Sequence, residues 1–421
     1  MSVVVAGGGL AGLVAARRLA AGGADVTLFE RRDRAGGRVR SVHEDGYVFD
    51  RGFQVLFTAY PAVRSELDLD ALDLRTFSPG AVIARPGQRS TLADPLRDPS
   101  ALTATAFNRD VTTGDKLRLF RHQRRLARTG VDEALAADDR TIAEALDAWG
   151  FSRKFRENFA APFYGGITLD RSLSTSQAVF EYTFKMLSEG ETAVPADGMG
   201  AIPAQLADRA EQAGVALETG TPVTAVEPSG PASDVAVEVG GETIRADAAV
   251  VATDPPTARE LTGVEAVPTA AAGCVTQHVA LPETQQLRIG KRIVLNAADD
   301  RPNQVAPMSA VAPEYAPDGR QLLSATFLDP AAGDDELFET VRAALADWFP
   351  ENRFDELELR RTDRVEFAQF PQPPGFRREL PAVDAPDGPV YLAGDYTRWS
   401  AIQGAMESGI RAAAAVADQE M

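Results

Sequence analysis

Residues 3–12 read VVVAGGGLAG, an apolar run followed by a Gly-x-Gly-x-x-Gly pattern at Gly7, Gly9 and Gly12. The apolar run predicts a buried strand, the alanine- and leucine-rich stretch after the last glycine predicts a helix, and residues 26–29 predict the next strand. In such a unit the first glycine makes a tight turn, the second lets the backbone approach a pyrophosphate, and the third lets the helix pack on the strand. Free N–H groups at the helix start then attract phosphate. We therefore expect a dinucleotide-binding α/β unit.

An acidic residue follows at the position where such a unit binds ribose. Glu30 ends the second predicted strand, where its carboxylate would accept hydrogen bonds from ribose hydroxyls. A carboxylate there prefers an unphosphorylated ribose, so the pattern favours FAD or NAD over NADP.

Two further segments carry residues suited to a diphosphate and a ring. In residues 34–38 two glycines lie beside two arginines, which suggests a backbone close to a diphosphate with help from a guanidinium group. A surface loop is the other interpretation. Residues 50–54 follow a predicted strand at 47–49, and Gln54 offers a donor and an acceptor to a ring edge.

The C-terminal part repeats the theme of a strand followed by a helix. Asp395 follows the predicted strand 390–393, where it would bind a polyol hydroxyl. The N–H groups of Ile402 and Gln403 open a predicted helix at about 402–418, and its dipole would face anionic charge. The small residues of this helix would let it approach the cofactor and the sheet; they are Gly404, Ala405, Ser408 and Gly409.

Three of these elements occur in a characteristic order: the dinucleotide-binding unit at 3–30, the arginine- and glycine-rich segment at 34–38 and the C-terminal segment at 394–405. By this order the whole chain resembles the FAD-dependent flavin amine oxidase superfamily, which includes protoporphyrinogen oxidases and phytoene-type desaturases. The resemblance implies non-covalent FAD and a backbone contact from Val223 to the adenine, with the strand 250–253 near the diphosphate. The cofactor-binding residues expected on this basis are Gly7, Gly9, Leu10, Ala11, Gly12, Glu30, Arg31, Gly36, Gly37, Arg38, Gly52, Phe53, Gln54, Val223, Gly394, Asp395, Ile402, Gln403 and Ala405.

The branch of the superfamily is less clearly marked. Amine oxidases use a lysine on a substrate-domain strand; the matching stretch 273–279 has none, and Lys291 lies beyond the next loop. Covalent flavin needs a cysteine near residues 370–376, and none is there. These departures favour a desaturase-like or protoporphyrinogen-oxidase-like enzyme that moves a hydride from an apolar substrate to flavin N5. A peroxide-producing amine oxidase is the alternative.

Fewer residues are expected to face the substrate than to bind the cofactor. Gln54, Tyr164, His278 and Trp399 are the cavity candidates, although no catalytic residue other than the flavin itself is assigned. The aromatic stretches 162–167 and 180–186 are more typical of a core, but the resemblance places such helices above a substrate cavity. The three histidines are too scattered for a metal site, so none is expected.

The resemblance and the strand pattern together give a Rossmann-like α/β FAD-binding domain with an inserted α+β substrate domain. The pattern also predicts a helix near 334–348. The expected FAD-binding domain comprises residues 1–80, 195–265 and 375–421, and the expected substrate domain comprises residues 81–194 and 266–374.

Composition restricts the partners and the cellular compartment that we expect for this protein. The formal net charge of −18 argues against nucleic acid. With one cysteine, no signal peptide and no long apolar segment, we expect a cytoplasmic protein that acts on a small apolar or amine-bearing molecule. Its oligomeric state is open.

Residues 116–128 are basic with helically spaced apolar positions, so they form either a solvated face or a peripheral membrane contact. A non-catalytic FAD-bound scaffold or a lipid-surface binding protein is the rival from another class.

The acidic, lysine-poor composition fits a protein that must stay hydrated in a salty cytoplasm. This explanation predicts that stability rises with salt. In molar salt the Debye length is about 3 Å, so repulsion among surface carboxylates is screened. We expect the melting temperature to increase from low to molar potassium chloride. A flat or falling melting temperature would favour the other explanation, a high-GC genome that replaces lysine with arginine.

Overall fold

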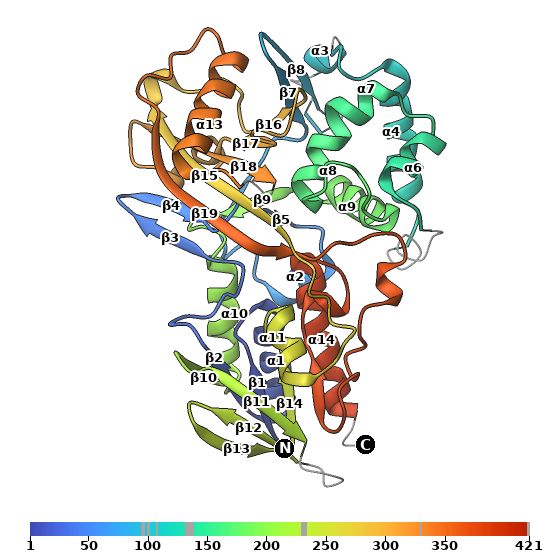
Figure 1. Ribbon diagram of the computed structural model, residues 1–421, viewed down its shortest axis with the longest axis vertical. Helices are drawn as coiled ribbons and strands as arrows, with labels where there is room; N and C mark the ends of the chain where they lie inside the picture. Colours follow the sequence, from blue (N-terminus) through green and yellow to red (C-terminus); the bar gives the residue numbers. More distant parts are fainter. Residues whose placement is uncertain are drawn as a thin grey trace.

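A five-stranded parallel sheet forms the lower half of the molecule (Figure 1). The computed structural model describes residues 1–93, 97–98, 102–106, 108–130, 139–228, 234–328 and 331–418. The strand order is β10-β2-β1-β14-β20, and every neighbouring pair is parallel. The strands are β1 (Ser2–Ala6), β2 (Asp25–Glu30), β10 (Ala216–Thr219), β14 (Ala248–Val251) and β20 (Val390–Leu392). The predicted Rossmann-like unit is confirmed.

Helix α1 (Leu10–Ala21) packs between β1 and two other helices, α10 (Ala201–Gln212) and α14 (Ile402–Asp418). The predicted C-terminal helix is thus confirmed. A Cβ atom on Gly409 would lie 2.3 Å from the backbone oxygen of Ala11, so α14 approaches α1 at backbone distance. The remaining elements around this sheet are α2 (Pro61–Glu66), α11 (Pro255–Thr262), and the antiparallel strands β11 (Val223–Pro228), β12 (Val235–Val239) and β13 (Glu242–Ala246).

A seven-stranded mixed sheet forms much of the upper half, in the order β19-β15-β18-β17-β16-β7-β8. Its strands are β7 (Ala81–Arg85), β8 (Gln88–Leu92), β15 (Ala272–Pro282), β16 (Ile293–Asn296), β17 (Gln304–Ala306), β18 (Arg320–Leu328) and β19 (Glu358–Gln369). Helix α13 (Asp334–Trp348) matches the predicted helix. Its buried residues follow helical spacing and pack against the sheet in one core; they are Leu337, Val341, Leu345 and Trp348.

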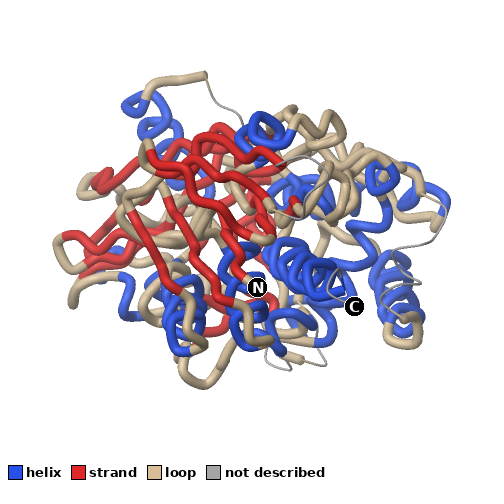
Figure 2. Tube along the Cα trace, turned by 90° about the horizontal axis from the view of Figure 1, so that it is seen from below, coloured by secondary structure: helices blue, strands red, loops and turns tan. Residues whose placement is uncertain are grey.

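Helices gather beside this second sheet (Figure 1). In the view along the long axis the strands gather on the left, and helices lie on the right and also around the strands (Figure 2). The helices are α3 (Leu102–Ala106), α4 (Thr113–Leu126), α6 (Ile142–Ala148), α7 (Arg153–Phe155), α8 (Ala161–Thr168) and α9 (Gln177–Glu189), with a π-helix at Arg156–Ala160. None of the helices that the structure describes has both the length and the apolar character needed to cross a bilayer.

Short elements complete the fold. They are β3 (Ser41–Glu44), β4 (Tyr47–Asp50), β5 (Leu56–Phe57), β6 (Leu74–Thr76), β9 (Thr192–Pro195), α12 (Met308–Val311), and the 3₁₀ turns Glu283–Gln285, Pro313–Tyr315, Phe376–Arg378 and Asp395–Thr397. Strand β9 pairs with both β5 and β6, so the chain returns to the same sheet after the helical excursion.

Candidate functional site

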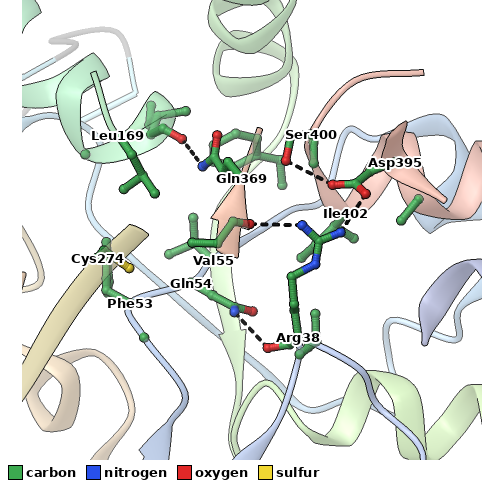
Figure 3. Close-up of a pocket in the computed structure, with 18 of the residues that line it drawn as sticks. Arg38, Phe53, Gln54, Val55, Leu169, Cys274, Gln369, Asp395, Ser400 and Ile402 are labelled. Atoms are coloured by element: carbon green, nitrogen blue, oxygen red, sulfur yellow. Dashed lines mark hydrogen bonds and ion pairs between the residues drawn. The ribbon is translucent and has the colours of Figure 1, made fainter. Parts of the chain in front are cut away.

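A cavity of about 1690 Å³ extends from the carboxyl ends of the parallel strands to the group of helices. One end is lined by the glycine turn after β1, and the other reaches α4 and α9. Ligands bind at the carboxyl ends of strands in open parallel sheets, so the position fits the general rule for this fold. Figure 3 shows part of the wall, where segments far apart in the sequence meet.

The glycine turn forms the floor of the cavity at the end next to the parallel sheet, which we call the nucleotide end. Gly7 has a φ of +110°, and a Cβ atom there would lie 2.6 Å from the backbone oxygen of Ala252. A Cβ atom on Gly12 would lie 2.0 Å from the oxygen of Gly7, so only glycine lets α1 start this close to β1. Gly7 and Gly9 line the cavity, whereas Gly12 is behind it and acts in helix packing. The turn leaves the backbone accessible to a diphosphate.

Glu30 lies beside this turn with an exposed fraction of 5% and lines the cavity. Its Oε2 accepts a hydrogen bond from the N–H of Gly8 at 2.8 Å, and its Oε1 accepts one from the N–H of Arg32 at 3.0 Å. Each carboxylate oxygen has further acceptor capacity for ribose hydroxyls. The carboxylate therefore both fixes the turn and offers acceptors to a nucleotide.

Arg38 and Asp395 form an ion pair across the cavity wall (Figure 3). The guanidinium donates to Asp395 Oδ1 at 2.6 Å and to the backbone oxygen of Ala368 at 2.9 Å. The other carboxylate oxygen accepts from Ser400 at 2.9 Å. Burial acts to lower the pKa of Arg38, but the carboxylate of Asp395 raises it above its ordinary value. Asp395 was expected to bind a polyol hydroxyl; it lines the cavity, and its two oxygens, like those of Glu30, have protein partners and further acceptor capacity. The ion pair holds the Arg38 guanidinium in place as a fixed cation.

The other expected cofactor residues divide into two groups. Those that line the cavity are Leu10, Ala11, Arg31, Gly36, Gly37, Gly52, Phe53, Gln54, Val223, Gly394, Ile402 and Ala405. Gln403 does not line it, because its buried side chain accepts a hydrogen bond from the N–H of Ala62 at 2.9 Å. Gln54 Nε2 donates to the backbone oxygens of Arg38 and Arg51, and its Oε1 is buried without a partner among the described residues.

The candidates for substrate contact do not all reach the cavity. Tyr164 lines it and is buried, and burial raises the pKa of its hydroxyl. Trp399 instead borders a separate void of about 30 Å³ together with Tyr182.

His278 lies outside the cavity, in a buried polar network where the two halves of the molecule meet. Its Nδ1 is 2.9 Å from Ser324 Oγ, and its Nε2 is 3.1 Å from the backbone oxygen of Asp50. Burial raises the pKa of Asp50, whose carboxylate accepts a hydrogen bond from Tyr315. The network joins strand β4 to the second sheet, so His278 contacts other protein groups and not the cavity. The sequence pattern of its strand did not indicate this.

Phe163 and Phe184, from the two aromatic stretches expected above a substrate cavity, line the cavity. Phe159 was not singled out from the sequence; it also lines the cavity and stacks on Phe163 at 5.1 Å between ring centroids. The i, i+4 spacing of these phenylalanines was a usable signal. Gln304 and Gln369 also line the wall, from strands that no local pattern connects.

The nucleotide end fits a dinucleotide cofactor on these observations. The glycine turn leaves space that a Cβ atom would fill, Glu30 offers acceptors, and α1 presents its N-terminus. Within the described ranges, no group of three or more His, Cys, Asp or Glu side chains is arranged to hold a metal ion.

Comparison with known proteins agrees with this arrangement. The family model for flavin containing amine oxidoreductases matches residues 10–417. The phytoene dehydrogenase of Streptomyces griseus is 32% identical over 288 residues, which cover 62% of this chain and 56% of that protein. Protoporphyrinogen oxidase 2 of Arabidopsis thaliana is 44% identical over 66 residues, which cover 16% of this chain and 13% of that protein. The chain thus spans little more than half the length of the first relative and a small part of the second.

Solved structures share the fold over nearly the whole chain. A putrescine oxidase bound to putrescine has a TM-score of 0.74 at 18% identity, with 99% of both chains covered. Cyclohexylamine oxidase from Brevibacterium oxydans has a TM-score of 0.70 at 19% identity, with 100% of this chain and 99% of that chain covered.

We predict that Glu30→Ala weakens FAD binding about tenfold or more, because a hydrogen bond to a charged group contributes roughly 1.5–3 kcal/mol. Titration of the apoprotein with FAD measures the effect. Glu30→Gln is the matched control that retains one acceptor oxygen, and we expect an intermediate affinity. Because Glu30 also holds Gly8, the melting temperature of each apoprotein should be recorded. Unchanged FAD affinity in Glu30→Ala would contradict the ribose assignment.

Proposed function

Because the chain belongs to the flavin containing amine oxidoreductase family, we propose that it is an FAD-dependent oxidoreductase acting on an apolar organic molecule of the polyene or porphyrinogen class. The bound flavin would supply the hydride acceptor. The protein would bind the substrate, orient it and exclude water. The observation that carries the proposal is the cavity itself, which runs from the nucleotide end to an aromatic wall.

The wall beyond the nucleotide end supports an apolar substrate. Phe159, Phe163 and Phe184 contribute ring surfaces, and Leu117 and Leu187 add aliphatic surface toward α4 and α9. Burying apolar surface contributes about 25 cal/mol per Å², so a long hydrocarbon gains affinity all along such a wall. Phytoene dehydrogenase is a relative whose name indicates a substrate of this kind.

An amine oxidase is the second candidate, favoured by the solved structures with this fold. The lysine that such enzymes use has no counterpart on β15, and Lys291 does not line the cavity. Lys291 is exposed and its Nζ donates to the backbone oxygen of Val311 at 3.3 Å. Lys116 does line the cavity, at the α4 end, and donates to the backbone oxygen of Thr105 at 2.6 Å. These positions support a substrate without a basic amine.

We also propose that α4 rests on an anionic membrane surface beside the cavity mouth. Leu117 and Phe120 are 49% and 41% exposed, and both line the cavity. Arg121 and Arg124 lie on the same helix, and the Arg124 guanidinium lies 5.5 Å from the Phe120 ring centroid. Exposed apolar side chains flanked by arginines suit the interface of a bilayer that carries acidic lipids. A substrate dissolved in lipid would enter the cavity there.

We predict that a polyene such as phytoene, or protoporphyrinogen, reduces the flavin under anaerobic conditions and that putrescine does not. Stopped-flow bleaching of the flavin absorbance measures this. Lys291→Met should retain the wild-type rate within about twofold, because its ammonium group is outside the cavity. Loss of a positioned proton-transfer group typically costs about 10²–10⁴-fold, so a drop of that size with FAD bound would favour the amine oxidase. Inertness toward all three compounds would favour a non-catalytic flavoprotein.

We predict that the double substitution Leu117→Ser with Phe120→Ser reduces co-sedimentation with phosphatidylserine-containing vesicles at least fivefold. The substitutions remove two exposed apolar side chains that would insert into the bilayer, and full burial of such a side chain contributes about 1.5–3 kcal/mol. Val42→Ser is the matched control, since Val42 is 37% exposed on β3, outside this surface. Equal binding of the wild-type protein and the double variant would exclude α4 as the contact.

A further inference from the structure

Two glutamine side chains from different strands meet the cavity wall beside consecutive residues of α8. Gln304 begins β17, and a Cβ atom on Gly166 would lie 2.5 Å from its Oε1 and 2.8 Å from its Nε2. Gln369 ends β19, and its Nε2 donates to the backbone oxygen of Ile167 at 2.6 Å. Gln304, Gln369, Gly166 and Ile167 all line the cavity, so the two amides share one stretch of its wall.

The orientation of the Gln304 amide is fixed by its neighbours. Arg171 donates to Asn303 Oδ1 at 2.9 Å, which leaves Asn303 Nδ2 as the donor. That nitrogen donates to the backbone oxygen of Pro162 at 2.9 Å and to Gln304 Oε1. The Oε1 of Gln304 is therefore occupied on the side of Asn303. Gln304 Nε2 has no acceptor among the described residues, although the residue is only 3% exposed.

The Gln369 amide is fixed in the opposite sense. Because its Nε2 donates to Ile167, its Oε1 is the atom left to accept (Figure 3). Figure 3 places this side chain near Leu169, and Cys274 and Phe53 line the same cavity. The wall here thus combines one unpaired donor and one unpaired acceptor, both uncharged, in largely apolar surroundings.

We propose that Gln304 and Gln369 form a neutral polar subsite that binds a hydroxyl group on an otherwise apolar substrate. Gln304 Nε2 donates to the hydroxyl oxygen, and the hydroxyl donates to Gln369 Oε1. A hydroxyl group satisfies both amides at once. A pure hydrocarbon displaces water from them and leaves both unpaired, so we expect it to bind more weakly. The subsite deepens the proposed function and rests on it, because it takes for granted that apolar molecules enter this cavity.

Binding of a matched pair of ligands tests the proposal in the FAD-loaded protein. Farnesol carries a hydroxyl on an isoprenoid chain, and farnesene is its hydrocarbon counterpart. The chain has one cysteine, Cys274, which lines the cavity, so the rate of its alkylation by N-ethylmaleimide reports ligand occupancy by mass spectrometry. We expect farnesol to protect Cys274 at concentrations at least tenfold lower than farnesene.

Substitutions then assign that preference to the amides. Gln304→Met should bring farnesol and farnesene within about twofold of each other without weakening farnesene binding. Gly166→Ala should do the same while keeping Gln304, because the added Cβ atom displaces the end of that side chain. Gln123→Met, a cavity-wall glutamine on α4, is the matched control and should keep the tenfold preference. FAD content and melting temperature establish that each variant is folded.

The outcomes separate the two proposals. Equal protection by both ligands in the wild-type protein overturns the subsite and leaves the apolar substrate standing. A farnesol preference that survives in both Gln304→Met and Gly166→Ala also overturns the subsite. Failure of both ligands to protect Cys274 overturns the apolar substrate and the subsite together.

Discussion

Helix α1 approaches its neighbours through glycine backbone rather than through side chains, and the site depends on that approach. A Cβ atom at Gly12 or Gly409 would overlap a backbone oxygen, at 2.0 Å from Gly7 and 2.3 Å from Ala11 respectively. Overlaps with backbone cannot be relieved by a change of rotamer, so larger residues would push α1 off the sheet or α14 off α1. Because α1 begins at the glycine turn and α14 follows the Asp395 loop, this packing brings two distant segments to the same end of the cavity.

Polar groups in the site serve two purposes at once. The Glu30 carboxylate accepts hydrogen bonds from Gly8 and Arg32 while it faces the cavity, and Arg38 is held by Asp395 and by a backbone oxygen of β19. Because these groups are already oriented by protein atoms, little side-chain entropy remains to be lost when a ligand binds. The same holds for the Gln304 and Gln369 amides, which are fixed by Asn303 and Ile167.

Local sequence patterns predicted the parts of the site that depend on local geometry. The glycine spacing, Glu30 at the end of β2, and helices α13 and α14 follow from periodicity and turn chemistry within a few residues. The same patterns could not show that Ser408 accepts a hydrogen bond from Gly394, or that His278 faces the buried network with Asp50 rather than the cavity. The sequence could not place Gln304 and Gln369 in the cavity wall for the same reason. The pairing of β17 and β19 with their neighbouring strands decides what those side chains face.

The order of strands in the parallel sheet has a consequence for how the chain folds. Strand β14 is flanked by β1, from the start of the chain, and by β20, from residues 390–392. Until β20 is in place, β14 presents an open edge of unpaired N–H and C=O groups, which is a template for pairing with other chains. Closing that edge requires contacts between residues far apart in sequence, and such contacts form slowly. A nucleotide that engages both the glycine turn and the loop after β20 would stabilise the closed sheet relative to its open precursor. The supply of flavin during synthesis would therefore determine the fraction of newly made protein that folds before it aggregates.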